Sequence, residues 1–380
     1  MTFKTQANKT QANFEPLVPL LEQGMRWRSL PSTAQNALQT RLTELTQAHC
    51  CEIAFCPQNP QDITGQVPQW LKLLETAATI FHRHPRLKAL FRPSLRPQTL
   101  VTAWRLWIPW AIHLCQLREK FSGSRPLIQG VLGVQGTGKT TLGIVMEILA
   151  AALGRSLLNL SIDDFYLTYA QRQTLRQQDP RLIWRGPPGT HDIDLALQTL
   201  DQLARGHTAV PQFDKSLHGG QGDSAAPKPV ESVDILWLEG WLVGCAPLDD
   251  AAFDGPLPLP IVTEGDRQFA RDCNERLGAY SPLWRRLDQW AVLAPKDYRW
   301  SKRWRLQAEA SRVAAGGKGL SVAEIGDFVD YFWRALHPDL FVTPWLTNGG
   351  ACEGDSPNCV VEILGDRSVG QIQTPSQLPK

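Results

Sequence analysis

Apolar residues recur at helical spacings through the first third of the chain. Between residues 15 and 118 they stand three and four positions apart, in segments such as LVPLLEQGM, WLKLLETAATIF and LVTAWRLWIPWAIHL. Such spacing gathers apolar side chains on one face of a helix. Trp104, Trp107 and Trp110 form one such stripe, which is more typical of packing against neighbouring helices than of a ligand cleft. The pattern predicts a helical N-terminal region over 15–125.

The pattern changes after EKFSGSRP (119–126), a charged and then Gly/Ser-rich stretch that is typical of a linker. From there, continuous apolar runs alternate with helical patterns. LIQGVLGVQ precedes a glycine loop and KTTLGIVMEILAAAL, and SLLNLSI and VDILWLEG follow. Such runs indicate strands of a parallel sheet that is covered by helices on both faces. We therefore expect an α/β domain over 126–370.

The rest of the chain continues this alternation. APLDDAAFDGPLPLP predicts a surface loop, AVLAP and CVVEIL predict strands, and the last ten residues predict a polar tail. Helices are predicted in EGDRQFARDCNERL, WSKRWRLQAEASR and VAEIGDFVDYFWRAL. At the other end, MTFKTQANKTQANF repeats a polar KTQAN pentad, so residues 1–14 are predicted to be a disordered tail.

Composition narrows the class of protein. The 380 residues are 43% hydrophobic and 20% charged, as in a soluble globular protein with one large domain and an appendage, or with two domains. A net charge of +2 favours no nucleic-acid partner. The most apolar stretch, 101–117, is too short and too interrupted to span a membrane. The eight cysteines contain no CxxC pair, and we expect mostly reduced thiols in a cytoplasmic protein. The oligomeric state stays open.

The segment GVQGTGKT matches the phosphate-binding pattern G-x-x-x-x-G-K-[ST], with a predicted strand before it and a predicted helix after it. Glycines let the backbone wrap a polyphosphate with its N–H groups pointing inward. Lys139 is expected to neutralise phosphate oxygens, and the Thr140 hydroxyl to bind Mg²⁺. The predicted nucleotide site comprises Gly133, Gly136, Thr137, Gly138, Lys139, Thr140 and Thr141. ATP is favoured because the chain lacks an N-K-x-D guanine motif.

An acidic pair, Asp163 and Asp164, ends the next strand-like run in SIDDFYLT. The carboxyl ends of parallel strands face the ligand crevice, where a carboxylate can accept a hydroxyl proton during phosphoryl transfer. This indicates a small-molecule kinase of the P-loop NTPase type, with Asp163 as the base. Asp164 has two open interpretations, a ligand of Mg²⁺ through water or a cap of the following helix.

Several segments resemble the group of uridine kinase, phosphoribulokinase and pantothenate kinase. SIDDFYLT is similar to its D-x-F-[YH] segment, which implies that Asp163 is the base. VDILWLEGW is similar to its second acidic strand, which implies that Glu239 is associated with magnesium. VPQFDKSLHGGQGD is similar to its acceptor segment, which implies that Phe213, Asp214 and His218 lie near the substrate.

A narrower resemblance rests on RGPPGTHD, FDKS, LEGW and WRLQAE, which resemble the plant and cyanobacterial type of D-glycerate 3-kinase over about residues 127–340. It implies ATP- and Mg²⁺-dependent phosphorylation of D-glycerate to 3-phosphoglycerate, in photorespiratory salvage. It also implies that His191 and Asp192 lie near the acceptor. One position departs from the pattern, because Phe213 stands where a Tyr is expected.

A small anionic acceptor needs a cation, preferably a guanidinium that makes two parallel hydrogen bonds. Arg185 and Lys215 lie in the two acceptor segments and suit this role, although both also fit surface positions beside turns. Basic residues recur in KDYRWSKRWR, which fits a solvated helix face. In related kinases an arginine-bearing lid lies at this point of the chain, so Arg299 and Arg303 are expected near the phosphates.

Two other functions stay open, a kinase of another small acceptor such as a nucleoside or ribulose phosphate, and a non-catalytic nucleotide-binding regulator. Intact residues at every catalytic position favour an enzyme. The predicted catalytic residues are Asp163, Lys139 and Glu239, and the predicted metal-binding residues are Thr140, Glu239 and Asp164. The predicted acceptor-binding residues are Asp164, Arg185, His191, Asp192, Phe213, Lys215 and His218.

Overall fold

The computed structural model describes residues 14–314, 320–347 and 357–374. Most of the predicted tail at 1–14 therefore lies outside the described residues, but its last residue contradicts the prediction. The Phe14 side chain is only 1% exposed, and the guanidinium of Arg105 lies 4.3 Å from its ring centroid. The Phe14 side chain therefore packs into the protein rather than belonging to a solvated tail.

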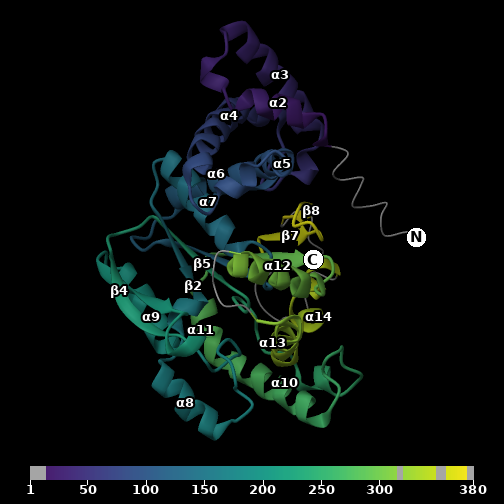
Figure 1. The fold of residues 1–380 in the computed structure, drawn as a ribbon. Coiled ribbons are helices and arrows are strands. Elements are labelled where there is room, and N and C mark those ends of the chain that lie inside the picture. Colours follow the sequence, from purple (N-terminus) through teal and green to yellow (C-terminus); the bar gives the residue numbers. More distant parts are fainter. Residues whose placement is uncertain (1–13, 315–319, 348–356, 375–380) are drawn as a thin grey trace, which may run out of the picture.

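The N-terminal region is helical, as predicted. Its helices are α2 (Leu17–Gly24), α3 (Ser32–Ala48), α4 (Pro60–Arg83), α5 (Arg96–Thr102) and α6 (Ile108–Lys120), joined by short turns η1 (Trp27–Ser29), η2 (Cys50–Glu52) and η3 (Lys88–Phe91). A π-helical segment, η4 (Ala103–Trp107), connects α5 to α6. In Figure 1 these helices form a layer above the sheet. No helix in the described parts of the chain is both long and apolar enough to cross a membrane.

A six-stranded sheet follows, in the order β2-β5-β1-β6-β7-β8. Its strands are β1 (Leu127–Gly133), β2 (Leu157–Ser161), β5 (Ile235–Gly240), β6 (Gln289–Pro295), β7 (Cys359–Ile363) and β8 (Val369–Gln373). Neighbours pair in parallel from β2 to β7, which confirms the predicted α/β fold. Only β8 pairs antiparallel, with β7.

The remaining elements surround the sheet. The helices are α7 (Lys139–Ala152), α8 (Tyr169–Gln178), α9 (Ile193–Leu203), α10 (Glu264–Arg276), α11 (Ser281–Trp284), α12 (Trp300–Ala314), α13 (Val322–Ala335), α14 (Pro338–Phe341) and α15 (Pro344–Thr347). Short 3-10 turns are η5 (Ile162–Phe165), η6 (His218–Gly220), η7 (Asp250–Phe253) and η8 (Leu277–Tyr280). A separate hairpin consists of β3 (Thr208–Asp214) and β4 (Asp223–Val230).

Alternate residues of the central strand β1 enter two different cores. Val131 belongs to the core that α7 and the N-terminal helices share with one face of the sheet. Leu132 belongs to the core on the opposite face, with α9, α10 and α13. The tryptophan stripe packs as predicted, since Trp110 is fully buried and its ring lies 5.2 Å from that of Trp237 in β5. The N-terminal helices therefore cover one face of the sheet.

Two features of the sheet were not predicted. The last ten residues are not wholly a polar tail, because β8 extends the sheet to Gln373 and residues 375–380 lie outside the described part. The hairpin β3–β4 contains Pro211, Pro227 and Pro229, and proline argues against a central strand because it cannot donate to the ladder. A two-stranded ribbon accepts proline, since each of its strands has an unpaired edge.

A buried arginine joins the first part of the chain to the last strand. Arg105 is 2% exposed, and its guanidinium donates to the carbonyl oxygens of Glu52 (3.1 Å), Val369 (3.0 Å) and Gly370 (2.9 Å). Burial lowers the pKa of Arg105 to about 10, so the side chain stays charged at neutral pH. One side chain thus fixes β8 against the N-terminal helices.

We predict that Arg105→Met destabilises the protein by about 3 kcal/mol, because it keeps the apolar stem but leaves buried carbonyl groups without donors. The free energy of unfolding from urea titration measures this. The control is Arg28→Met, since the Arg28 side chain is 65% exposed and its ion pair with Glu75 is a surface contact. Equal effects of the two substitutions would contradict the structural role of Arg105.

Candidate functional site

The loop between β1 and α7 has the backbone of a phosphate cradle. Gly136 and Gly138 have φ angles of +87° and +89°, which favour glycine. A Cβ atom at Gly136 would lie 2.6 Å from Cβ of Trp304 in α12, so the loop also needs glycine for close packing. The other predicted members, Gly133, Thr137 and Thr141, lie at the end of β1, in the loop and in the first turn of α7.

Lys139 and Thr140 stand at the first turn of α7. The Lys139 ammonium donates to the carbonyl of Val134 (3.1 Å), and the Thr140 hydroxyl donates to Oε1 of Glu239 (2.8 Å). Glu239 is 5% exposed near the end of β5, and burial raises its pKa. Burial lowers the pKa of Lys139, although Glu239 and Asp163 oppose that shift. The structure thus brings the predicted lysine, threonine and glutamate together.

Asp163 lies in η5, directly after β2, and is held by two side chains. Its Oδ1 accepts from the Tyr166 hydroxyl (2.8 Å), and its Oδ2 accepts from the Lys215 ammonium (2.6 Å). Burial alone would raise the pKa of Asp163, but attraction to Lys215 and these two hydrogen bonds outweigh it and lower the pKa. The carboxylate is therefore ionised at neutral pH, and Lys215 pairs with it.

The neighbouring Asp164 has a different environment. Its Oδ2 accepts from the backbone N–H of Ser161 (3.0 Å), as part of a capping box at η5. Burial raises the pKa of Asp164 to about 6, against the hydrogen bond from Ser161 that lowers it. Of the two interpretations left open by the sequence, this contact matches the cap.

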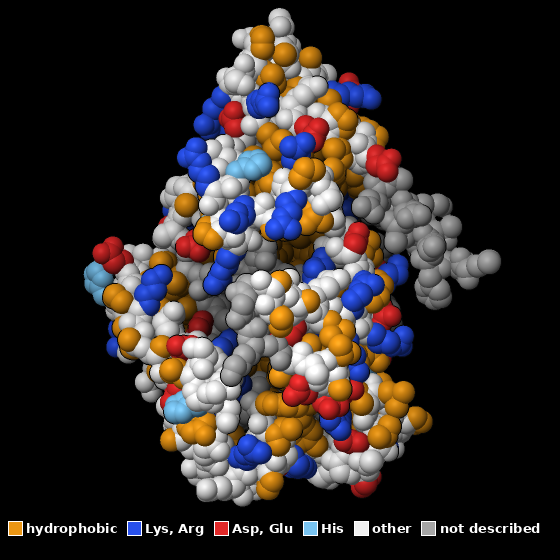
Figure 2. Space-filling model, in the orientation of Figure 1, with side chains coloured by type: hydrophobic (Ala, Val, Ile, Leu, Met, Phe, Trp, Pro, Cys, Tyr) orange, Lys and Arg blue, Asp and Glu red, His pale blue; other side chains and the backbone are white. Residues whose placement is uncertain are grey.

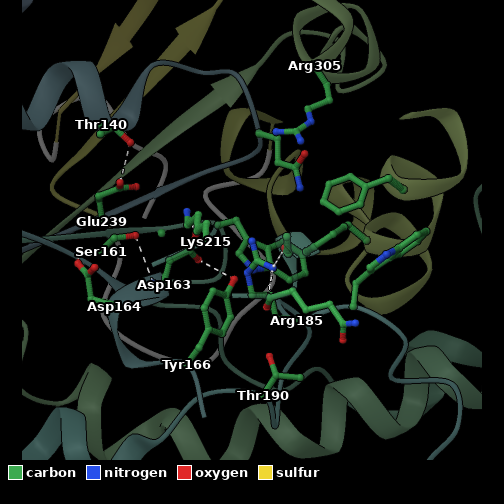
Figure 3. Close-up of a pocket in the computed structure, with 18 of the residues that line it drawn as sticks. Thr140, Ser161, Asp163, Asp164, Tyr166, Arg185, Thr190, Lys215, Glu239 and Arg305 are labelled. Atoms are coloured by element: carbon green, nitrogen blue, oxygen red, sulfur yellow. Dashed lines mark hydrogen bonds and ion pairs between the residues drawn. The ribbon is translucent and has the colours of Figure 1, made fainter. Parts of the chain in front are cut away.

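These groups share one cavity of about 1430 Å³. Figure 2 shows this face of the molecule hollowed at mid-height, with Lys and Arg side chains along the rim. Figure 3 shows the Thr140–Glu239 pair at one end, Asp163 with Lys215 and Tyr166 in the middle, and Arg185 beyond them. The residues that line the cavity include the predicted Gly136, Lys139, Thr140, Asp163, Asp164, Arg185, Lys215 and Glu239.

Arg185 lines the cavity and is held by the loop that joins β3 to β4. Its Nη1 donates to the carbonyl oxygens of Gly220 (2.8 Å) and Gln221 (2.9 Å). Its guanidinium carbon lies 5.8 Å from the ring centroid of Tyr166. Arg185 therefore stands one aromatic side chain away from Asp163.

Phe213 and His218 do not line the cavity in the structure. The Phe213 ring packs behind the wall, 5.0 Å from the Tyr166 ring and 5.5 Å from the guanidinium carbon of Arg185. His218 stacks on Tyr169 (4.0 Å between ring centroids), and its Nε2 lies 3.1 Å from Oδ2 of Asp223. Both residues therefore lie outside the cavity, next to residues that form its wall.

His191 and Asp192 also lie behind the cavity wall. Asp192 is the N-cap of α9, and its Oδ1 accepts from the N–H of Leu195 (2.9 Å). His191 is 5% exposed, with Nδ1 2.7 Å from the Tyr280 hydroxyl oxygen. Burial lowers the pKa of His191 to about 4, so the ring is neutral at pH 7. Their contacts are structural in the arrangement seen here.

The two arginines expected near the phosphates point elsewhere. Arg299 is an exposed side chain that pairs with Asp297 (3.6 Å), and Arg303 donates to the carbonyl of Gly365. Neither lines the cavity, whereas Arg305 on the same helix does. The basic character of the segment was visible in the sequence, but the face of α12 that meets the cavity depends on how Trp304 packs under the loop.

Sequence reasoning missed Tyr166 and Arg172, which both line the cavity. Tyr166 follows Asp163 by three residues within SIDDFYLT, so its position directly after η5 was a usable signal. Arg172 stands in the polar helix α8 and carries no local signal, because only the fold brings α8 to the hairpin loop.

The arrangement suits a nucleotide with a shared metal ion. The described residues contain no group of three or more His, Cys, Asp and Glu side chains placed to hold a metal ion by themselves. Mg²⁺ usually takes one or two carboxylates together with phosphate oxygens and water. The hydroxyl of Thr140 and the carboxylate of Glu239 fit that mode, beside a glycine loop and a helix N-terminus that suit an anion.

The chain is similar to several known kinases. No family model matches the chain. The chloroplastic D-glycerate 3-kinase of Arabidopsis thaliana is 33% identical over 299 residues, which cover 74% of this chain and 63% of that protein. The kinase mug58 of Schizosaccharomyces pombe is 31% identical over 55% of this chain and 79% of its own length. A solved D-glycerate 3-kinase from Cryptococcus neoformans superposes with a TM-score of 0.61 and 25% identity, over 70% of this chain and 96% of that one.

We predict that Gly136→Ala raises the dissociation constant for ATP by about tenfold or more, since a strained backbone and a clash with Trp304 distort the cradle. Calorimetric titration measures it. Gly255→Ala is the matched control, because a Cβ there meets no atom within 4 Å. Tight ATP binding by Gly136→Ala would show that the loop does not hold the nucleotide.

Proposed function

Because this chain belongs to the family of P-loop kinases that includes D-glycerate 3-kinase, we propose that it transfers the terminal phosphoryl group of ATP to the 3-hydroxyl of D-glycerate. The chain spans 63% of the length of the Arabidopsis relative. The identity of the acceptor, D-glycerate, is therefore proposed for this chain. One observation carries it. An ionised carboxylate, Asp163, shares a cavity with the phosphate-loop residues Lys139 and Thr140.

In the proposed reaction, the loop amides and Lys139 hold the polyphosphate of ATP. Thr140 and Glu239 hold Mg²⁺, which supplies positive charge to the phosphate oxygens when it is bound. Lys139 contributes a further positive charge at the transferring group. The donor half of the cavity thereby lowers the charge repulsion that an incoming hydroxyl oxygen meets.

Asp163 receives the proton of the acceptor hydroxyl. Its pKa is lowered by Lys215 and Tyr166, so it is a weak base. A weak base is sufficient, because the phosphoryl transition state is loose and the proton leaves late. Most of the acceleration then comes from alignment and from charge neutralisation by the loop. Tyr166 and Lys215 keep the carboxylate aimed at the acceptor.

The acceptor half of the cavity favours an anion. Arg185 and Lys215 both line it, and the guanidinium of Arg185 donates only to neutral backbone carbonyls. A nucleoside acceptor is neutral and gains nothing from this charge, whereas the carboxylate of glycerate does. We also propose a role in photorespiratory salvage and a cytoplasmic location. The thiols of Cys56, Cys115 and Cys359 are buried like apolar side chains, which fits a reducing compartment.

The acceptor is tested with purified protein, ATP and Mg²⁺ against D-glycerate, uridine and ribulose 5-phosphate. ADP release is expected with D-glycerate, with the phosphate on the 3-hydroxyl by phosphorus NMR. Uridine is expected to be inert because it offers no carboxylate. Turnover of uridine with D-glycerate inert would overturn the acceptor and leave a kinase of another substrate. ATP binding with no turnover of any acceptor would favour the regulator.

The base is tested by substituting each member of the acidic pair. Asp163→Asn should lower kcat by about 10²–10⁴-fold, as for other positioned bases, with the KM for ATP little changed. Asp164→Asn is the matched control, since its carboxylate accepts from the Ser161 backbone and should affect stability more than chemistry. A severe loss of kcat in Asp164→Asn with a mild one in Asp163→Asn would reverse the assignment.

A further inference from the structure

Arg172, on helix α8, is a buried cation that has no carboxylate partner among the described residues. Its side chain is 9% exposed and lines the cavity. Nη2 donates to the carbonyl oxygens of Gln221 (2.9 Å) and Gly222 (2.6 Å), which are neutral acceptors. Nη1 is buried and has no hydrogen-bond partner in the parts of the chain that the structure describes. A buried donor that folding leaves unpaired carries a desolvation penalty that a ligand can relieve.

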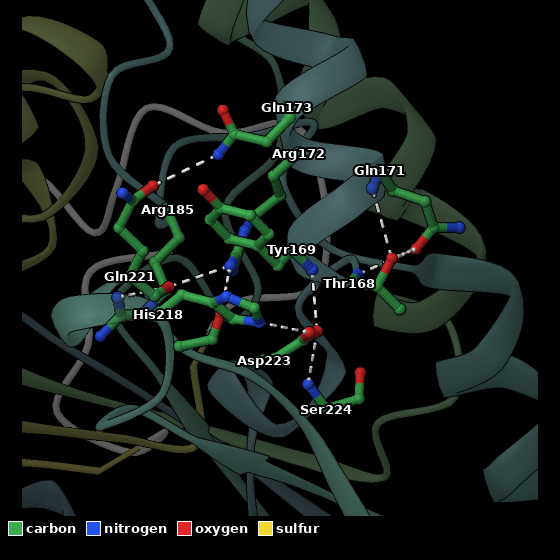
Figure 4. A network of polar contacts seen from close by, with 11 residues as sticks. Thr168, Tyr169, Gln171, Arg172, Gln173, Arg185, His218, Gln221, Asp223 and Ser224 are labelled. Carbon is green, nitrogen blue, oxygen red and sulfur yellow. Dashed lines mark hydrogen bonds and ion pairs between the residues drawn. The ribbon is translucent and has the colours of Figure 1, made fainter.

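Asp223 attracts Arg172, but its carboxylate is already engaged in other contacts. Asp223 accepts from the backbone N–H groups of Tyr169 (2.8 Å) and Ser224 (2.9 Å), and its Oδ2 lies 3.1 Å from Nε2 of His218. Figure 4 shows this cluster beside Arg172. The acidic residues Glu324 and Asp327 also line the cavity, but they come from α13, on another wall. Asp223 therefore attracts Arg172 without forming an ion pair with it, and among the described residues no carboxylate pairs with Arg172 at its own end of the cavity.

A second guanidinium lies next to it. Arg172 and Arg185 hold successive carbonyl groups of the hairpin loop, from Gly220 to Gly222. Their guanidinium carbons lie 5.2 and 5.5 Å from the ring centroid of Phe213. Burial, and then repulsion by Arg185, lower the pKa of Arg172. Two like charges held together in a partly buried wall disfavour the empty site and favour an anion between them.

We propose that Arg172 binds the carboxylate of the acceptor together with Arg185. Both side chains are held in place by the loop at residues 217–222, between β3 and β4. This inference rests on the proposed function, because it takes the acceptor to be a small hydroxy acid. The geometry suits such a molecule. Tyr166 contacts Asp163 through its hydroxyl, and its ring faces Arg185, so one aromatic side chain separates the base from the cationic wall. In glycerate, only one carbon separates the carboxylate from the carbon that bears the reacting hydroxyl.

The same contacts explain why two arginines are used. Each guanidinium donates from one nitrogen to the loop carbonyls, and these hydrogen bonds fix its orientation. Its other N–H groups can then donate to a ligand. The exposed side chains of Gln173 and Gln221, joined by a hydrogen bond of 3.3 Å, lie beside this wall and add no negative charge. The wall is thus fixed by neutral groups, and its positive charge is left for the acceptor.

The test compares Arg172→Gln with the wild-type enzyme in three measurements, namely the KM for D-glycerate, the KM for ATP, and the inhibition constant of D-glyceramide. D-Glyceramide is the neutral amide of the same acid and competes with it. Arg172→Gln is expected to raise the KM for D-glycerate by about tenfold or more, the effect of losing a charge-assisted hydrogen bond. The KM for ATP and the inhibition constant of D-glyceramide should stay within about twofold of the wild-type values. ATP binds at the phosphate loop, and the neutral amide has no charge for Arg172 to pair with.

A merely structural role gives a different result. If the substitution makes the 217–222 loop collapse, the KM for D-glycerate and the inhibition constant of D-glyceramide rise by the same factor. That outcome overturns the inference. An unchanged KM for D-glycerate overturns it as well. Inactivity of the wild-type enzyme toward D-glycerate is distinct from both, since it overturns the proposed function itself.

Two further variants complete the design. Arg205→Gln removes an exposed arginine after α9 and should leave all three constants unchanged. If Arg172→Gln does not fold, Arg172→Lys decides the question. The lysine keeps the charge but not the fork, so the KM for D-glycerate should rise while the inhibition constant of D-glyceramide stays the same. Parallel changes of both constants in Arg172→Lys would again overturn the inference.

Discussion

The central strand β1 is buried on both faces between β5 and β6, and the position of the chemistry follows from that burial. All seven of its residues are buried, so polar groups can be presented only beyond its carboxyl end. The parallel register then aligns its neighbours there. Glu239 of β5 stands opposite Val131 on one side and Ser161 of β2 on the other. The glycine loop, Glu239 and the acidic turn after β2 therefore meet at one edge of the sheet.

The sheet and the phosphate loop are supported by helices from opposite parts of the chain. The N-terminal helices cover one face through Trp110 on Trp237, and Arg105 ties them to β8 at the end of the sheet. Close to the site, Trp304 of α12 packs under Gly136 and donates to the carbonyl of Gly365. The phosphate loop is thus held from below by a helix that comes late in the chain, and the two ends of the chain support one site.

Charge is divided along the cavity in a way that matches the proposed reaction. Glu239 on the donor side is bound to Thr140, and Asp163 in the middle of the cavity is bound to Lys215. On the acceptor side, Arg172 and Arg185 are held by backbone carbonyls and keep their positive charge. A neutral partner orients a guanidinium without cancelling its field, so this end of the cavity attracts an anion. The acceptor preference that we propose and the orientation of the wall have the same physical origin.

By itself, the sequence determined the parts of this protein that depend on neighbours along the chain. Short continuous apolar runs predicted the buried strands, and GVQGTGKT predicted the loop, since its strand, glycines and helix are contiguous. The placement of Asp163 was predictable for the same reason, as it follows the end of β2 by two residues. The hairpin, β8, the burial of Phe14 and the face of α12 that carries Arg305 were not predictable locally. Arg172 shows why, because its contacts lie some 50 positions away, at Gln221 and Gly222, and only packing of α8 on the hairpin loop brings them together.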